Sequence, residues 1–206
     1  EAAEYAGSPL DFEGGTPKML VKVGDKVEAG APLFFDKKRP EILFTSPVSG
    51  TVAAVNRGEK RKVLSVVVAA DEVTAYKQFA SLDLAKASRE QIVELLLESG
   101  LWTKFTQRPY GIVATPSDEP KAILVSAFDS APLAIDYDFA LADQQQPLQK
   151  GFDVLRRLTD GKVHLSYNAC GKKPEIEGVE LHAFKGKHPA GNVGVQIHHI
   201  DPINKG

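Results

Sequence analysis

The sequence contains a single cysteine, Cys170, among 206 residues. One thiol excludes an intrachain disulfide framework, an iron–sulfur cluster held by cysteines alone and a cysteine-rich zinc site. It is compatible with a reducing cytoplasm. Because no histidine lies near it in the stretch 168–171, we expect Cys170 to be a buried or turn residue and not a nucleophile.

Long apolar runs and strong net charge are also lacking. The longest apolar run, Val63 to Ala70, is far too short to span a bilayer, and no signal-peptide pattern opens the chain. With 25 basic and 27 acidic side chains the net charge is −2, which gives no field to attract nucleic acid or anionic lipid. No nucleic-acid partner is therefore expected.

No Gly-x-Gly-x-x-Gly motif occurs in the chain. A flavin or nicotinamide dinucleotide needs such a loop between a strand and a helix to hold its phosphates. The residues after the strand predicted at 122–127 are Phe128-Asp129-Ser130-Ala131-Pro132, which offer no phosphate cradle. We therefore expect no flavin and no iron–sulfur cluster in this chain, and no entry of electrons from NADH through it.

Short strands separated by turns are predicted for residues 18–70. Met19, Val21, Val23 and Val27 alternate with Lys and Asp, which is typical of a half-buried strand. The turn at 23–26 recurs in type at 57–60, and each copy follows an apolar strand. Two such β halves would interleave and close a small barrel or sandwich, which removes the edges that each half exposes.

The pattern changes after Asp71 to alternating helices and strands. The run 88–91, Ser-Arg-Glu-Gln, has the form of a capping box, Gly100 is a helix stop, and a second helix is predicted from Pro147 to Leu158. Strands are predicted at 163–167 and 179–184, and the continuous apolar run 122–127 suits a central strand covered on both faces. The predicted organisation is an all-β domain at 1–71 followed by an α/β domain at 72–206.

The first domain resembles lipoyl and biotinyl carrier domains. Those domains have a Gly-Asp turn, a modified lysine at a hairpin tip and a Ser-Pro-x-x-Gly turn, matched here by Gly24-Asp25, Asp36-Lys37 and the stretch 46–50. Against a carrier role, Lys37 is followed by Lys38, Arg39 and Pro40, and the loop is longer than the lipoyl pattern. We expect the carrier fold without the modification.

A glycine-rich segment near the C-terminus, residues 187–202, holds three of the five histidines. Gly191 and Gly194 permit close backbone approaches, so a shaped turn is predicted, followed by an apolar strand from Val195 to Ile200. Adjacent histidines on a strand point to opposite faces. We therefore do not expect His198 and His199 to form a metal site with His188.

Four segments together identify a family resemblance: Gly-Gly-Thr-Pro-Lys-Met at 14–19, Ser-Pro-Val-Ser-Gly at 46–50, Phe-Asp-Ser-Ala-Pro-Leu-Ala at 128–134, and Lys-His-Pro-Ala-Gly-Asn-Val-Gly at 187–194. The chain resembles the A subunit of the bacterial Na⁺-translocating NADH:quinone reductase. It is more remotely similar to the C subunit of the Rnf complex and to the NADH-binding subunit of respiratory complex I. The resemblance implies a biotinyl/lipoyl-like barrel-sandwich hybrid followed by an α/β, Rossmann-like domain.

The same resemblance implies a peripheral subunit of a six-subunit sodium pump, on the cytoplasmic face of the bacterial inner membrane. Quinone is the implied substrate, and NAD, FAD, FMN, riboflavin and the 2Fe-2S cluster are implied for partner subunits. Family members are longer at both ends, so the second domain is expected to be truncated here. Where the family pattern leads us to expect Thr-His-Ile-His, this chain has Val195-Gln196-Ile197-His198, and glutamine donates a hydrogen bond but does not relay a proton.

The quinone-site hypothesis places Phe128 and Pro132 as apolar walls and Asp129 as the partner of the His188 imidazole, with the backbone at Gly191 and Gly194 close to the ring. His198 is a further candidate in this site. The hypothesis requires residues 128–132 and 188–194 to lie side by side at one end of the sheet. Three alternatives stay open at this point: an Asx-type turn at Asp129 with a packed aromatic, a structural docking subunit that binds no quinone, and a lipoyl or biotin carrier.

Overall fold

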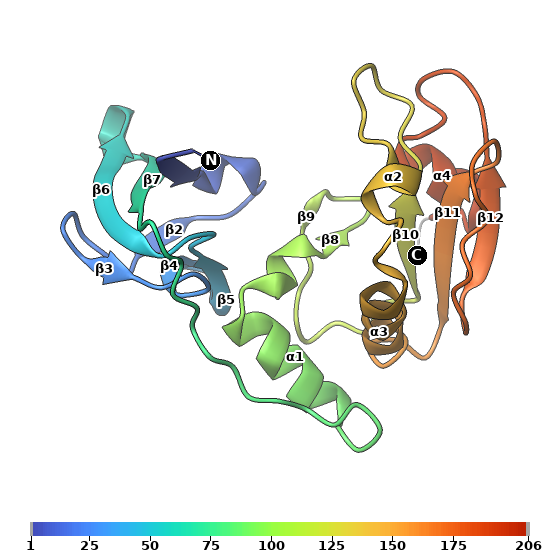
Figure 1. The fold of residues 1–206 in the computed structure, drawn as a ribbon, viewed down its shortest axis with the longest axis horizontal. Coiled ribbons are helices and arrows are strands. Elements are labelled where there is room, and N and C mark those ends of the chain that lie inside the picture. The colour runs from blue at the N-terminus through green and yellow to red at the C-terminus, as the bar shows by residue number, and fades with distance from the viewer. Residues whose placement is uncertain (1, 205–206) are drawn as a thin grey trace. The chain divides into compact units, whose positions relative to one another are not determined.

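The computed structural model describes residues 2–204, and these fall into two compact units (Figure 1). One unit comprises the chain up to Leu82 together with Glu90–Pro116, and the other comprises Asp83–Arg89 and the chain from Ser117 onward. By contact, residues 90–116 thus belong with the N-terminal β strands. The domain boundary that the sequence predicts at residue 71 remains a prediction.

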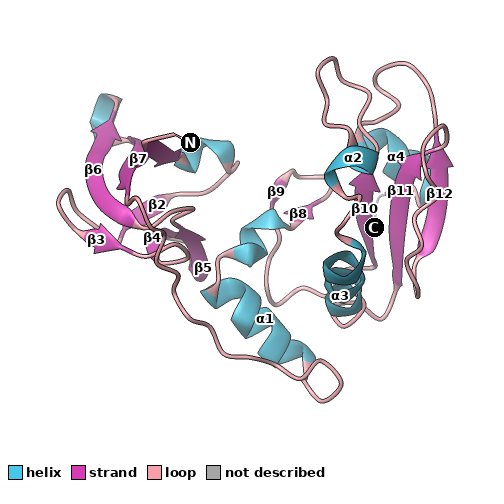
Figure 2. Ribbon diagram, in the orientation of Figure 1, coloured by secondary structure: helices cyan, strands magenta, loops and turns pink. Residues whose placement is uncertain are grey.

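Two small antiparallel sheets make up most of the first unit (Figure 2). One sheet has the order β1-β7-β6-β3, with bounds Glu4–Gly7, Val63–Ala70, Gly50–Arg57 and Lys26–Val27. The other has the order β2-β4-β5, with bounds Pro17–Met19, Pro32–Asp36 and Arg39–Thr45. Their inward-facing side chains form the core: Leu33, Phe34, Ile42, Phe44, Val52, Val66 and Val68 are buried. Burial alternates over parts of strands β5 and β7, as expected where one face of a sheet packs on a core, whereas the neighbours Leu33 and Phe34 on β4 are both buried.

The alternating pattern from Met19 to Val27, with the turn pair Gly24-Asp25 predicted inside it, corresponds to two short strands in the structure, β2 and β3. Strand β2 ends at Met19, and Gly24 takes a left-handed φ of 92° that turns the chain before Lys26. The Asp25 carboxylate accepts a hydrogen bond from the Lys22 amide at 2.9 Å, and Val23 is 59% exposed. The predicted turn at Gly24-Asp25 is confirmed, and the residues between Met19 and Lys26 belong to it and not to a strand.

The first unit continues with a helix and a small hairpin. Helix α1, Arg89–Glu98, is followed by Gly100 at φ 75°, which confirms the predicted stop. Strands β8, Thr106–Gln107, and β9, Ile112–Val113, then pair antiparallel. Trp102, just before this hairpin, is 5% exposed and donates from its indole nitrogen to the Ala114 carbonyl oxygen at 2.8 Å, as expected for a core residue.

The second unit contains a three-stranded parallel sheet in the order β10-β11-β12, with bounds Ala122–Ala127, Lys162–Asn168 and Glu180–Phe184. Helix α3, Gln145–Leu155, packs on one face through Phe152, which clusters with Val163, Leu165 and Ile176. A short helix α2, Tyr137–Ala140, precedes it. Among residues 2–204 strand β10 lies at an edge, so the prediction that it is central is wrong for the sheet as described.

Helix α4, Val193–Ile200, covers the other face of this sheet. Alternate strand residues point to this face, and the Phe184 ring there lies 6.4 Å from the ring of His199 on α4. The prediction of a strand from Val195 to Ile200 is therefore wrong. A short apolar run does not separate strand from helix by periodicity, and the amides of Val195 and Gln196 both bond to the Asn192 carbonyl, which starts the helix.

No helix in the described part of the chain is both long enough and apolar enough to span a bilayer.

Candidate functional site

Two loops meet beyond the carboxyl end of β10. One follows β10 at residues 128–132, and the other, 186–192, leads from β12 into α4. The Gly191 amide donates to the Ser130 hydroxyl at 2.8 Å, and the same hydroxyl lies 3.3 Å from Nδ1 of His188. The hypothesis requires residues 128–132 and 188–194 to lie side by side, and the structure shows this for Ser130 with His188 and Gly191.

Gly191 is in this contact because no larger residue fits. A Cβ atom built on Gly191 would lie 2.2 Å from the Ser130 amide nitrogen and 2.6 Å from the Asp129 carbonyl carbon. These neighbours are backbone atoms, so they do not move aside as a flexible side chain does. The glycine serves the close approach of two chain segments to one another.

The side chain of Gln196, on α4, hydrogen-bonds to a residue of each of these two loops. Its side chain is fully buried, and Nε2 lies 3.3 Å from the Phe128 carbonyl oxygen and 3.3 Å from the Gly191 carbonyl oxygen. An amide nitrogen carries two hydrogens, so one side chain serves both acceptors. Histidine carries at most one hydrogen on each ring nitrogen, so it does not offer this pair of bonds from a single atom. Gln196, which stands where the family pattern predicts a histidine, thus links the two loops through its side-chain amide.

The role predicted for Asp129 is wrong. Its carboxylate accepts from the Ala131 amide at 2.8 Å, which is the Asx-type turn that stood as the alternative, while Ser130 is the residue beside His188. Asp129 has a short side chain that reaches its own turn before it reaches the other loop. Phe128 is 9% exposed and packs inside the unit, with its carbonyl bonded by the Ser126 hydroxyl at 2.9 Å.

Two further candidates lie apart from this contact. Gly194 is an exposed residue of α4, and a Cβ there would meet no atom within 4 Å, so no close approach requires it. His198 belongs to the last turn of α4, whose following residue Asp201 bonds to Lys121 just before β10 begins. The error comes from taking 195–200 as a strand, because a helix carries His198 toward the amino end of the sheet.

An exposed apolar rim borders the loop after β10. Pro132 is exposed, and Leu133, Ile135 and Phe139 are 105%, 58% and 85% exposed. Leu133 also has a left-handed φ of 62°, which is uncommon for a residue with a branched side chain. The site thus combines hydrogen-bonding groups at Ser130 and His188 with solvent-facing apolar side chains.

A histidine pair that sequence reasoning missed lies on the face of the sheet that α4 covers. Nδ1 of His164 on β11 is 3.0 Å from Nε2 of His182 on β12, and His164 is 6% exposed. Burial lowers the pKa of His164, and the neighbouring His182 lowers it further, while Glu180 and Asp201 oppose these effects weakly. The alternation within each strand places both residues on this face, but only the register of β11 against β12 makes them neighbours.

Neither a metal-binding group of side chains nor the surface hollow described here coincides with the candidate residues among those the structure describes. Within residues 2–204 no three His, Cys, Asp or Glu side chains are grouped so as to hold a metal ion. A surface hollow of about 550 Å³ is lined by Lys173, Pro174, Glu175, Ile176, Glu177 and Leu181, and none of the candidate residues lines it.

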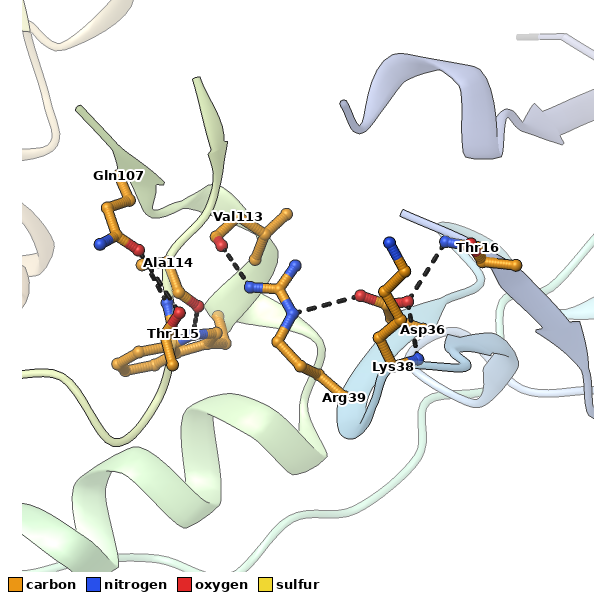
Figure 3. A network of polar contacts seen from close by, with 9 residues as sticks. Thr16, Asp36, Lys38, Arg39, Gln107, Val113, Ala114 and Thr115 are labelled. Atoms are coloured by element: carbon orange, nitrogen blue, oxygen red, sulfur yellow. Dashed lines mark hydrogen bonds and ion pairs between the residues drawn. The ribbon is translucent and has the colours of Figure 1, made fainter. Parts of the chain in front are cut away.

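The hairpin that resembles a carrier tip is fastened within its own unit (Figure 3). The buried Asp36 carboxylate accepts from the amides of Thr16 and Lys38 at 3.2 and 3.1 Å and pairs with Nε of Arg39 at 3.2 Å. Arg39 also donates from Nη1 to the Val113 carbonyl oxygen at 2.7 Å. Lys37 itself is exposed at the turn.

Comparisons with known proteins identify the relatives of both units. The model of the NqrA N-terminal barrel-sandwich hybrid domain matches residues 1–71, and that of the NqrA second alpha/beta domain matches residues 87–206. The chain is 42% identical to the A subunit of the Na(+)-translocating NADH-quinone reductase of Cellvibrio japonicus over 199 residues, which is 95% of this chain and 44% of that protein. It is 43% identical to the corresponding protein of Serratia proteamaculans over 201 residues, 94% of this chain and 44% of that one. The chain thus spans less than half the length of these relatives.

Proposed function

The chain belongs to the NqrA family, the A subunits of the Na⁺-translocating NADH-quinone reductase, and from this premise we propose that it acts within such a complex at the quinone-binding step. Its fold agrees with the family: a barrel-sandwich hybrid domain is followed by an α/β domain. The proposed activity of the whole complex is electron transfer from NADH to quinone coupled to sodium export.

One observation carries the quinone proposal: the loops at 128–132 and 186–192 converge beyond the carboxyl end of β10. Ligands of open α/β sheets sit at this end of the strands. A quinone needs hydrogen-bond donors at its carbonyl oxygens and an apolar surface along its ring and tail. The Ser130 hydroxyl and the His188 imidazole supply the donors, and Pro132 with Leu133 supplies exposed apolar surface beside them.

The roles of the two polar groups follow from their contacts. Ser130 accepts the Gly191 amide hydrogen, which leaves its own hydroxyl hydrogen for His188 or for a ligand. His188 is exposed, and an imidazole is able to donate a hydrogen bond or to transfer a proton to a bound ligand. Reduction of a quinone to a quinol takes up two protons, and an exposed imidazole beside one carbonyl would deliver one of them.

The rest of the redox chemistry is assigned to partner subunits in this proposal. NAD, FAD, FMN, riboflavin and the 2Fe-2S cluster belong there, and five further subunits are expected around this one. Those partners hold it at the cytoplasmic face of the inner membrane. In support, the sequence has one cysteine and no glycine-rich phosphate loop.

A structural docking role within the same complex is the alternative, and the exposed Leu133, Ile135 and Phe139 favour it as a contact for a neighbouring protein of the complex. A lipoyl or biotin carrier is less well supported. Lys37 is exposed at the hairpin tip, but Lys38, Arg39 and Pro40 follow it, which differs from the carrier pattern.

The test is the His188→Ala substitution in the assembled complex. We expect quinone reduction to fall by at least about tenfold, the effect of losing a proton donor, while NADH oxidation by an artificial acceptor is retained. His199→Gln is the matched control, since His199 lies on α4 against Phe184. An equal loss of both activities would assign His188 to the fold or to docking.

A further inference from the structure

The two faces of the parallel sheet carry side chains of different character. The residues that pack toward Phe152 of α3 are apolar: Ile123, Val125, Val163 and Leu165. Alternate residues of each strand point the other way, toward α4. These include Ser126, Ser166 and His182, which are neighbours across the sheet because Ser126 pairs with Ser166 and Ser166 with His182. A polar row therefore crosses all three strands beneath α4.

Two atoms in this layer are buried without a partner. Ser166 on β11 and Gln196 on α4 are both 0% exposed. Across the part of the chain that the structure describes, the buried side-chain atoms with no hydrogen-bond partner in the protein are Oγ of Ser166 and Oε1 of Gln196. Buried polar atoms of native proteins bond to protein groups or to ordered water, since an unpaired one is costly. Both oxygens thus require a partner.

A shared acceptor places the Gln196 carboxamide beside the polar row. The Phe128 carbonyl oxygen accepts from Nε2 of Gln196 at 3.3 Å and from the Ser126 hydroxyl at 2.9 Å. Ser126 is the register partner of Ser166, and adjacent strands lie about 5 Å apart. The two unpaired oxygens therefore belong to one buried region between α4 and the sheet, although they form no direct hydrogen bond with each other.

The chemistry of the two groups selects a water molecule as the partner. Both hydrogens of Gln196 Nε2 point to carbonyl oxygens, those of Phe128 and Gly191, so Oε1 needs a donor from elsewhere. The Ser166 hydroxyl both donates and accepts, and water does the same. Serine side chains are also smaller than the valine and leucine that face α3, which leaves room for a water in a polar setting.

We propose that an internal water molecule binds between α4 and the sheet and joins Oε1 of Gln196 to Oγ of Ser166. The water donates one hydrogen to Oε1 and forms a second hydrogen bond with the Ser166 hydroxyl. His182, the next residue of the row, is the third polar group beside this position, and buried waters make about three hydrogen bonds. Because Gln196 also bonds to both loops of the candidate site, the water connects these loops to the histidine pair. This water site does not require that the loops bind quinone.

A high-resolution crystal structure of the 206-residue chain tests the site directly. We expect density for one water within hydrogen-bond distance of both Oγ of Ser166 and Oε1 of Gln196. A direct bond between the two side chains, a bond from either of them to another protein group, or an empty space between them would overturn the proposal.

The stability of the Ser166→Ala chain distinguishes the same possibilities in solution. If water bonds to the hydroxyl, its removal should raise the equilibrium constant for unfolding of the second unit about fivefold, the effect of losing one hydrogen bond. If the hydroxyl had no partner, the alanine chain would be as stable as the unsubstituted chain or more stable, and the water site would be refuted.

A double-substitution cycle tests whether Ser166 and Gln196 share the water. In a Gln196→Met chain, Ser166→Ala should change the unfolding constant by less than about twofold, because methionine has already removed the other end of the bridge. Gln149→Met is the matched control, since Gln149 lies on α3 over the opposite face and bonds to Glu177. There Ser166→Ala should keep its full effect of about fivefold. Equal effects of Ser166→Ala in all three backgrounds would contradict a bridge between Ser166 and Gln196.

Discussion

The amide of Gly191 donates to the hydroxyl of Ser130 at 2.8 Å, so two loops separated by 61 residues in sequence are held at hydrogen-bond distance. The contact joins a backbone amide to a side-chain hydroxyl. It fixes where His188 stands relative to the end of β10, because His188 precedes Gly191 by three residues and lies against the same hydroxyl.

The Gly191→Ala substitution should therefore destabilise the α/β unit. Its Cβ would lie 2.2 Å from the Ser130 amide nitrogen, and the loops must separate to admit it. We expect a loss of about 1–3 kcal/mol in the free energy of unfolding, measured by urea denaturation.

Gly194→Ala is the matched control in the same segment. Gly194 lies inside α4 with no atom within 4 Å of the added carbon, so the substitution should raise stability by up to about 1 kcal/mol. If both alanines had the same effect, the close approach at Gly191 would not be the reason for its glycine.

Substitutions at Gln196 should separate its two hydrogen bonds from its packing. Gln196→Glu has the same shape but directs a carboxylate at the carbonyl oxygens of Phe128 and Gly191, and Gln196→Met fills the space without polar atoms. We expect both to lose about 1–3 kcal/mol near neutral pH, with Glu the worse, since a buried unpaired charge costs more than an unpaired carbonyl.

Acid should discriminate these two variants. Lowering the pH protonates the new carboxylate and restores a donor, so the deficit of Gln196→Glu should shrink relative to Gln196→Met. Denaturation midpoints from about pH 5 to 8 measure this. If both variants were as stable as the unsubstituted chain at every pH, Gln196 would act through its volume alone and its hydrogen bonds would contribute nothing.

Much of the fold followed from local patterns. The strands at 163–167 and 179–184 and the helix near 147–158 were predictable because their apolar periodicity and their boundaries agree. The helix at 195–200 was not predictable, since Val195-Gln196-Ile197 alternates apolar and polar residues like a strand. In the structure the polar Gln196 is fully buried, and the Asn192 carbonyl accepts the first hydrogen bonds of the helix. The position of β10 at the edge of the sheet depends on which other strands are present, so the amino-acid composition of β10 alone does not predict it.

The meeting of the two loops was predicted correctly, while the contacts between their residues differ from those predicted. The closely spaced glycines indicated that residues near Gly191 approach another segment of the chain. Because ligands of open α/β sheets bind at the carboxyl ends of strands, that segment was predicted to be 128–132. The choice of Asp129 over Ser130 as the partner of His188 failed because local Asx bonding competes with a long-range contact. The His164–His182 pair required the strand register, which sequence alone does not provide.

Removal of the Asp36 carboxylate should loosen the hairpin in the first unit. Asp36 is 2% exposed, and Asp36→Ala would leave the Arg39 guanidinium without its carboxylate and the amides of Thr16 and Lys38 without an acceptor. We expect a loss of about 3 kcal/mol in thermal or urea unfolding.

Lys37→Ala, at the exposed tip of the same hairpin, is the control and should change stability by less than about 0.5 kcal/mol. Intact mass of the chain, expressed with lipoate and biotin available, should show Lys37 unmodified. A lipoyl or biotinyl mass on that residue would restore the carrier hypothesis.

The buried histidine pair predicts how stability depends on pH. Burial first, and then the neighbouring His182, hold the pKa of His164 below its ordinary value of 6.5. The unfolded chain therefore binds a proton at higher pH than the folded chain does. The stabilisation is complete above about pH 6.5 and is lost as the pH falls through that value toward the lower folded pKa. The groups facing His164 are Lys162, Glu180, His182 and Asp201, and the two carboxylates moderate the effect without reversing it.

Urea midpoints measured from about pH 5 to 8 should thus decrease on acidification, and His164→Gln should flatten that dependence while retaining a side chain able to bond to His182. His199→Gln, on the surface of α4, should leave the pH dependence as it is in the unsubstituted chain. If the His164→Gln chain showed the same loss of stability in acid as the unsubstituted one, other groups would be responsible and the pair would have no part in it.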